Sequence, residues 1–346
     1  MKHSLVEILL GETTAETFST LESLTLQESQ RPTVFGIHSD NVARVVQERF
    51  ELFHLVYPEF TLLCERLKLS PLPIELLWNF WLPLAIQISQ WKQQCQHQCL
   101  IQGFLGGQGT GKTTLTLILT LILKQLSYEA VSLSIDDLYL SHRDRINLQK
   151  SDPRLVRRGP PGTHDVKLGL QVLQQFREGR FPIELPQFDK SLHHGSGDRI
   201  SPKLINHADI VLFEGWFVGV HPINSTFENA PAPILTDSDC TFAQDMNEQL
   251  RNYLPLWELL DRLIVLYVPD YQLSKQWRRQ AEHNMIAQGK TGMSDAEIDE
   301  FVEYFWKALH PELFIQPLVE DSHRTDLVIK IDADHQPTCI YQLSTT

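Results

Sequence analysis

The chain has 346 residues, of which 42% are hydrophobic and 21% are charged, and its formal net charge is −13. This is the composition of an ordinary globular protein, long enough to bury a substantial core. The acidic balance argues against a protein that coats nucleic acid or an anionic membrane, because those surfaces attract cationic partners. We therefore expect no nucleic-acid partner and no membrane partner, and an anionic ligand would need a local basic site.

The N-terminus and the cysteines bear on the cellular compartment. Residues 1–10 contain too short an apolar run for a signal peptide and lack the Arg and Ser content of a transit peptide. The 5 cysteines are scattered and odd in number, which does not indicate a disulfide framework. Cys95, His97 and Cys99 have no second pair at the spacing of a zinc site. We expect a cytoplasmic protein, and the sequence is silent on oligomeric state.

The first part of the chain has a helical pattern. Apolar residues recur at three- and four-residue spacing over residues 42–60 and 73–91, which predicts helices. We expect residues 1–96 to form an N-terminal helical extension. Residues 97–346 would then form the main domain.

After Cys99, short apolar runs alternate with helical stretches. Five of these runs predict strands, at residues 100–105, 131–135, 210–213, 263–268 and 327–331. Because the runs are apolar on both faces, they fit a parallel sheet covered by helices on both sides. The expected fold is therefore α/β, with three α/β/α layers and a mostly parallel central sheet. Ligands of such sheets bind at the carboxyl ends of the strands.

A phosphate-binding loop follows the first predicted strand, and residues 113–126 read as the helix after it, which is the context that the motif requires. The loop carries the pattern G-x-x-x-x-G-K-[ST], and the residues expected to bind nucleotide are Gly106, Gly107, Gln108, Gly109, Thr110, Gly111, Lys112, Thr113 and Thr114. Glycines let backbone N–H groups face phosphate oxygens, and the helix N-terminus adds its dipole. We expect Lys112 to reach the β- and γ-phosphates of ATP and the Thr113 hydroxyl to bind Mg²⁺.

Two further strands end in carboxylates. Glu214 closes the run at residues 210–213 and is expected to hold Mg²⁺ directly or through water. Asp136 and Asp137 follow the run at residues 131–135. A kinase that acts on a hydroxyl benefits from a carboxylate that orients the nucleophile and accepts its proton, and we favour Asp136 for this role. The alternative for Asp137 is a turn residue.

The order of these motifs resembles the superfamily of phosphoribulokinase, uridine kinase and pantothenate kinase. In that superfamily the first Asp of the strand-end motif is the general base, which maps onto Asp136. Further blocks, between about residues 70 and 335, resemble more narrowly the D-glycerate 3-kinase family of plants and cyanobacteria. The blocks are Arg158-Gly159-Pro160-Pro161-Gly162-Thr163-His164-Asp165, Pro186-Gln187-Phe188-Asp189-Lys190-Ser191, Gly197-Asp198-Arg199, Phe213-Glu214-Gly215-Trp216-Phe217-Val218-Gly219, Trp277-Arg278-Arg279-Gln280-Ala281-Glu282 and Gly292-Met293-Ser294-Asp295.

The resemblance implies a photorespiratory enzyme that phosphorylates D-glycerate with ATP and Mg²⁺. Acceptor-binding insertions would span about residues 140–205, where a basic cluster lies in the acidic chain. An Arg or Lys fork suits the glycerate carboxylate, and His and Asp side chains can bind the two hydroxyls. The residues expected to bind the acceptor are Asp136, Tyr139, Arg158, His164, Asp165, Lys190 and Arg199.

The resemblance also implies a helical lid at about residues 270–300. Either Arg278 or Arg279 would close over the transferring phosphoryl group and stabilise its charge, acting with Lys112 and Asp136. Residues 332–337 would border the adenine. Two alternatives stay open: a kinase of a nucleoside, pantothenate or sugar phosphate, and a regulatory P-loop ATPase with its N-terminal helices as a docking surface.

Overall fold

The computed structural model describes residues 1–27, 31–287 and 292–343, so residues 288–291 of the predicted lid lie outside it. A central six-stranded sheet has the order β2-β5-β1-β6-β7-β8, in which only β8 is antiparallel to its neighbour among the described strands. All five predicted strands are present, with ends shifted by at most two residues. The strands are β1 (Leu100–Gly106), β2 (Ala130–Ser134), β5 (Ile210–Gly215), β6 (Arg262–Tyr267), β7 (Leu327–Ile331) and β8 (Pro337–Tyr341).

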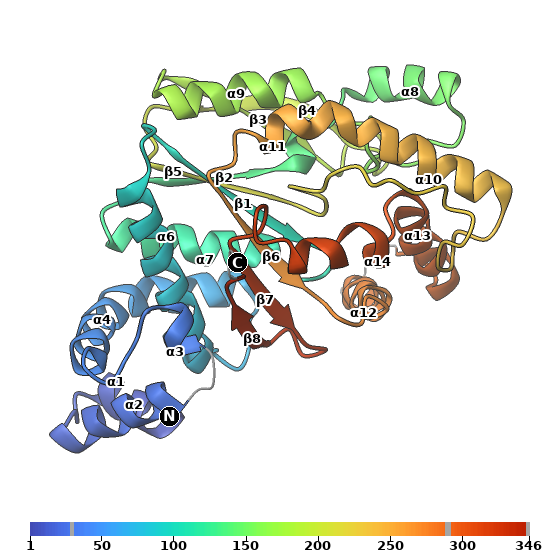
Figure 1. Cartoon of the computed structure of the whole chain (residues 1–346). Helices are drawn as coiled ribbons and strands as arrows, with labels where there is room; N and C mark the ends of the chain where they lie inside the picture. The colour runs from blue at the N-terminus through green and yellow to red at the C-terminus, as the bar shows by residue number, and fades with distance from the viewer. Residues whose placement is uncertain (28–30, 288–291, 344–346) are drawn as a thin grey trace.

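Alternating side chains of the sheet enter two hydrophobic clusters, one on each face. On β1, Leu100 and Phe104 pack with α7 (Lys112–Gln125) and the N-terminal helices, whereas Ile101 and Leu105 pack on the opposite face. The helices α9 (Val166–Glu178) and α11 (Leu254–Trp257) cover this second face. Figure 1 shows the resulting layers, which confirm the predicted α/β fold with a mostly parallel central sheet.

Helices form nearly all of the first part of the chain. They include both predicted helices, and the second is interrupted by a π-helical turn. Their bounds are α1 (Lys2–Leu10), α2 (Ala15–Gln27), α3 (Arg31–Val34), α4 (Val42–Leu67), α5 (Ile74–Leu76), η1 (Leu77–Trp81) and α6 (Leu82–Gln94).

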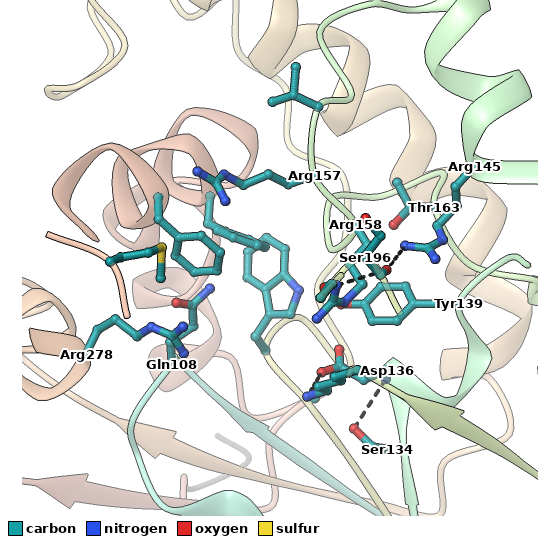
Figure 2. Close-up of a pocket in the computed structure, with 18 of the residues that line it drawn as sticks. Gln108, Ser134, Asp136, Tyr139, Arg145, Arg157, Arg158, Thr163, Ser196 and Arg278 are labelled. Atoms are coloured by element: carbon teal, nitrogen blue, oxygen red, sulfur yellow. Dashed lines mark hydrogen bonds and ion pairs between the residues drawn. The ribbon is translucent and has the colours of Figure 1, made fainter. Parts of the chain in front are cut away.

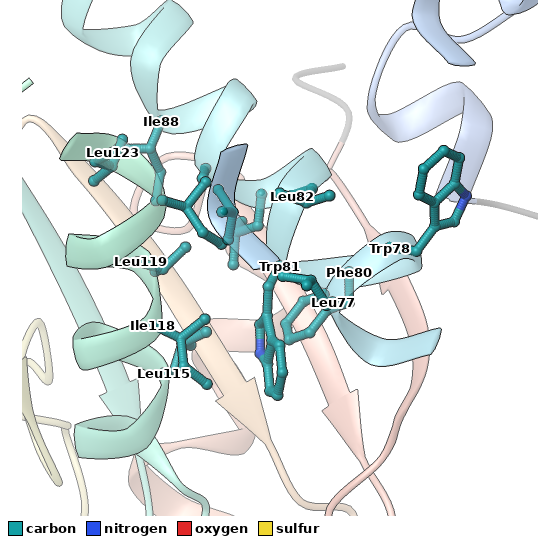
Figure 3. Packing of buried hydrophobic residues seen from close by; sticks show 14 of the residues in the cluster. Leu77, Trp78, Phe80, Trp81, Leu82, Ile88, Leu115, Ile118, Leu119 and Leu123 are labelled. Carbon is teal, nitrogen blue, oxygen red and sulfur yellow. The ribbon is translucent and has the colours of Figure 1, made fainter. Parts of the chain in front are cut away.

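The N-terminal helices share a hydrophobic cluster with the P-loop helix. Leu77, Trp81 and Ile88 lie in the same cluster as Leu115 and Ile118 of α7 (Figure 3). Burial of such side chains stabilises a fold by roughly 1.5–3 kcal/mol each. The N-terminal helices are therefore part of the support beneath the P-loop, while the domain boundary at residue 96 stays a prediction.

The sequence pattern missed a hairpin beside the main sheet. The strands β3 (Ile183–Asp189) and β4 (Asp198–Ile205) pair antiparallel, and most of β4 is exposed. An exposed strand rich in charged residues has no apolar run to mark it. The other elements are η2 (Ile135–Leu138), α8 (His142–Ser151), α10 (Asp237–Gln249), η3 (Leu250–Tyr253), α12 (Leu273–Ala287), α13 (Asp295–Ala308), α14 (Pro311–Phe314) and η4 (Gln316–Glu320).

All five cysteines are free thiols. In the described ranges, no helix is both long and apolar enough to cross a membrane.

Candidate active site

The P-loop joins β1 to α7 at the carboxyl edge of the sheet. Gly109 has φ +82°, and a Cβ there would lie 2.9 Å from the Cβ of Trp277, so both conformation and space favour glycine. Lys112 Nζ donates hydrogen bonds to the carbonyl oxygens of Gly106 (2.7 Å) and Gly107 (3.0 Å). Burial lowers the pKa of Lys112, while the charges of Glu214 and Asp136 act in the opposite direction.

Glu214 lies where three strands bring their carboxyl ends together. It pairs in register with Phe104 of β1 and Ser134 of β2, and it is 6% exposed. Thr113 Oγ1 donates a hydrogen bond to Glu214 Oε1 at 3.1 Å. A hydroxyl and a carboxylate that converge beside a phosphate-binding loop form the hard-oxygen donor set of a magnesium ion that also binds ATP phosphates and water. These two residues therefore fit Mg²⁺.

A single 3-10 turn after β2 contains both aspartates, and their side chains have different partners. Asp137 Oδ2 accepts from the Ser134 N–H (3.0 Å) and Asp137 Oδ1 from the Phe188 N–H (3.2 Å), so both oxygens bind backbone. Burial raises the pKa of Asp137 against these hydrogen bonds. Asp137 is thus a turn residue that ties β3 to this edge of the sheet.

The Asp136 carboxylate faces the cavity instead. Its Oδ2 accepts from Lys190 Nζ at 2.6 Å. Burial acts to raise the pKa of Asp136, but the charge and hydrogen bond of Lys190 and a hydrogen bond from Tyr139 outweigh it and leave the pKa lowered. Asp136 is therefore held as a carboxylate, the form that a general base requires.

A cavity of about 940 Å³ joins these groups (Figure 2). Of the residues that the structure describes, six Lys or Arg side chains and three carboxylates line it, although the whole chain has a net charge of −13. The predicted site residues that line the cavity are Gln108, Gly109, Lys112, Thr113, Asp136, Tyr139, Arg158, Lys190, Glu214 and Arg278. The local reversal of sign makes the cavity suited to polyanionic ligands.

Two arginines hold the loop between β3 and β4 over the cavity. Arg158 Nη1 donates to the carbonyl oxygens of Gly195 (2.7 Å) and Ser196 (3.0 Å). Arg145 Nη1 donates to the same Ser196 oxygen at 2.7 Å. Burial and the charge of Arg158 lower the pKa of Arg145. The sequence pattern missed Arg145 because α8 has no buried face that would mark which side points inward.

The structure distinguishes the two lid arginines. Arg278 lines the cavity, forms an ion pair with Glu282 (3.2 Å) and lies over the Phe301 ring. Arg279 lies outside the cavity lining, and its Nη2 binds both carboxylate oxygens of Asp299 at 2.6 Å. In this conformation Arg278 therefore faces the cavity and Arg279 does not.

Three of the residues predicted to bind the acceptor lie outside the lining of the cavity. His164 is 5% exposed, stacks on Tyr139 and has its Nδ1 2.8 Å from Tyr253 Oη. Asp165 caps α9 by accepting from the Leu168 N–H, and it forms an ion pair with Arg199 at 3.0 Å. Each of these side chains is already engaged by the fold and lies outside the cavity lining, so their contact with the acceptor stays a prediction. The three residues absent from the lining are His164, Asp165 and Arg199.

Tryptophan and phenylalanine side chains complete the cavity and were not predicted as site residues. Trp277 stacks on His335 with ring centroids 4.3 Å apart, and its Nε1 donates to the Ala333 carbonyl at 3.0 Å. The predicted adenine border at residues 332–337 therefore contacts a cavity wall without lining the cavity itself. The sequence signal for Trp277 was a tryptophan within the predicted lid helix. Core packing explains such a residue equally well, so this signal did not identify it as a site residue.

A phosphate-binding loop, a strand-end carboxylate pair and a lid arginine around one cationic cavity define a P-loop kinase site. No family model matches the chain. D-glycerate 3-kinase, chloroplastic, of Arabidopsis thaliana is 30% identical over 80% of this chain, which spans 64% of that protein's length. The uncharacterized kinase mug58 of Schizosaccharomyces pombe is 33% identical over 59% of this chain and 78% of its own.

A solved structure adds an independent comparison. The D-glycerate 3-kinase of Cryptococcus neoformans superposes with a TM-score of 0.65 at 26% identity, covering 75% of this chain and 99% of its own. The chain therefore belongs to the family of ATP-dependent P-loop kinases that contains D-glycerate 3-kinase.

Proposed function

We propose that this protein transfers the γ-phosphoryl group of ATP to the primary hydroxyl of D-glycerate, producing 3-phosphoglycerate and ADP. The observation that carries the proposal is the presence of Asp136, Lys190 and Arg158 in the same cavity as the P-loop Lys112. A carboxylate suits a hydroxyl nucleophile, and the two cations suit an acceptor with a carboxylate of its own. The family relationship supports the same acceptor.

In the proposed reaction, Asp136 orients the hydroxyl and accepts its proton as the oxygen–phosphorus bond forms and the bond to ADP breaks. Lys112 and the P-loop amides hold the phosphates, and Arg278 stabilises the charge of the transferring group. Thr113 and Glu214 would hold Mg²⁺, which neutralises phosphate charge when it is bound. Photorespiration and the cytoplasmic location stay predictions.

A substrate panel tests the proposal. Purified protein is incubated with ATP, Mg²⁺ and either D-glycerate, L-glycerate, uridine, pantothenate or a sugar phosphate, and the products are identified by NMR. We expect 3-phosphoglycerate from D-glycerate only. Faster turnover of another acceptor, or 2-phosphoglycerate as the product, would replace the proposed substrate or its reacting hydroxyl.

Two substitutions test the roles within the site. Asp136→Asn should lower kcat by about 10²–10⁴ while ATP binding survives, because a general base contributes about that factor. Lys112→Ala should weaken ATP binding itself. Near-normal turnover in the first variant would remove Asp136 from the chemistry, and unchanged ATP affinity in the second would contradict the phosphate-binding role.

A further inference from the structure

Three cations at the acceptor end of the cavity have partners within the protein. Arg145 and Arg158 bind backbone carbonyl oxygens of the loop between β3 and β4. Lys190 differs, because its partner is the carboxylate of Asp136, the proposed base. The ammonium thus engages the carboxylate that would accept a proton from the hydroxyl.

We propose that Lys190 is a latch on Asp136, whose ammonium holds the carboxylate until an anionic acceptor draws the ammonium away. The base is then released only when an acceptor of the correct charge class is bound. The inference rests on the proposed kinase function and makes Lys190 a specificity-determining residue of that site.

The two partners differ in their freedom to move. The Lys190 side chain is 59% exposed, whereas that of Asp136 is 25% exposed. The Asp136 N–H donates to Ser134 Oγ at 3.2 Å, and its carboxylate also accepts a hydrogen bond from Tyr139. When the pair separates, the long lysine side chain therefore moves and the carboxylate stays in place.

Hydrogen bonds between its two neighbours hold the backbone at Lys190 in place. Lys190 follows β3 directly, and Asp189 Oδ1 accepts from the Ser191 N–H (2.8 Å) and the Ser191 hydroxyl (2.6 Å). One residue further back, the Phe188 N–H donates to Asp137 beside the base. These contacts hold the Lys190 backbone at a constant position relative to Asp136, so that only side-chain rotation is needed to open the pair.

The electrostatics give the latch its effect. An ammonium beside a carboxylate stabilises the charged form and makes it a weaker base, consistent with the lowered pKa of Asp136. Water in an empty acceptor site would then be activated slowly, which limits hydrolysis of ATP. An acceptor carboxylate offers Lys190 a competing anion, and Arg158 lines the same cavity to share it.

Hydrolysis of ATP without an acceptor is the measurement that reports the latch. In this reaction a water oxygen bonds to the γ-phosphorus, the bond to ADP breaks, and the water proton passes to Asp136. With ATP and Mg²⁺ alone, Lys190→Gln should raise the rate by about tenfold, a fraction of the full effect of a general base. The double variant Lys190→Gln/Asp136→Asn should lose this increase.

Matched variants separate the latch from a general effect of charge. Lys203→Gln removes an exposed lysine of β4 in the same hairpin, outside the cavity, and should leave hydrolysis unchanged. Lys190→Arg keeps the positive charge and should raise hydrolysis by less than Lys190→Gln does. An unchanged rate in Lys190→Gln, or an increase that persists in the double variant, would overturn the proposal.

The pH profile adds a second readout. Asp136 acts as a base only when ionised, so kcat/KM for the acceptor falls as the pH drops below the pKa of Asp136. Removing the ammonium raises that pKa, so the acid limb of kcat/KM should move to higher pH in Lys190→Gln; an unmoved limb would contradict the latch. The hydrolysis test needs no glycerate, so failure of the protein to phosphorylate glycerate would refute the proposed acceptor and leave the latch independently testable.

Discussion

His164 offers a test that separates a wall residue from a ligand of the acceptor. Burial lowers the pKa of His164 from its ordinary value of 6.5 to about 3, and its Nε2 has no hydrogen-bond partner in the described structure. The neutral ring is therefore required in the folded state. The pKa of His164 is lower in the folded state than in the unfolded state, so only the unfolded state binds the proton as the pH falls below about 6.5. The free energy of unfolding therefore decreases as the pH is lowered.

The size of this effect follows from the two pKa values. Between pH 7.5 and pH 5, His164 alone should lower the free energy of unfolding by about 2 kcal/mol. His164→Gln removes this contribution to the pH dependence of the free energy of unfolding, because glutamine does not titrate. The variant keeps a polar side chain beside Tyr253. The acceptor KM should change less than about threefold, since the ring does not line the cavity.

Urea unfolding at both pH values measures the effect in wild type and variant. The difference between their pH dependences cancels the contributions of all other titrating groups. His38→Gln, which removes an exposed histidine, serves as the control and should keep the wild-type pH dependence. Equal pH dependence in His164→Gln and wild type would refute a buried neutral ring, and a large increase in acceptor KM would restore His164 to the binding site.

Three further predictions follow from side chains around the cavity. Arg278→Gln should lower kcat by about 10²–10³, because it removes the cavity charge that the proposed reaction uses to stabilise the phosphoryl group, whereas Arg279→Gln should lower kcat less than tenfold; equal losses would contradict the assigned orientations. Trp277→Ala should raise the KM for ATP by about tenfold by opening the wall beside the P-loop, and an unchanged value would place the nucleotide elsewhere. Asp137→Asn should cost about 1–3 kcal/mol of stability, measured by urea unfolding, with kcat within tenfold of wild type; a catalytic loss without destabilisation would reverse the two aspartates.

The sheet and the phosphate-binding end of the site could be predicted because local patterns determine them. Strands buried on both faces appear as apolar runs, and a parallel sheet brings their carboxyl ends to one edge. This placement at the strand ends predicts three residues of the site: Glu214, Asp136 and Lys112. The hairpin of β3 and β4 could not be found in the same way, since an exposed strand needs no apolar run.

The acceptor end was harder to predict because polar side chains there have competing partners far away in sequence. Arg199 carries the same charge as Arg158, yet it pairs with Asp165, whereas Arg158 reaches the cavity wall. The spacing of residues along the sequence does not distinguish the position of Arg199 from that of Arg158. His164 likewise lies in a motif of the family, but its contact with Tyr253 makes it part of the wall.

The motif blocks around Arg158 therefore contain supporting residues as well as residues that line the cavity. A Cβ at Gly159, which has φ +128°, would lie 2.3 Å from the Phe305 ring, and the Gly159 carbonyl accepts from Trp216 Nε1 at 3.2 Å. Gly162 donates its N–H to Tyr253 Oη at 2.8 Å. These contacts fix the backbone that directly follows Arg158. Gly159 thus serves the site by allowing the Phe305 ring to approach the chain closely beside Arg158.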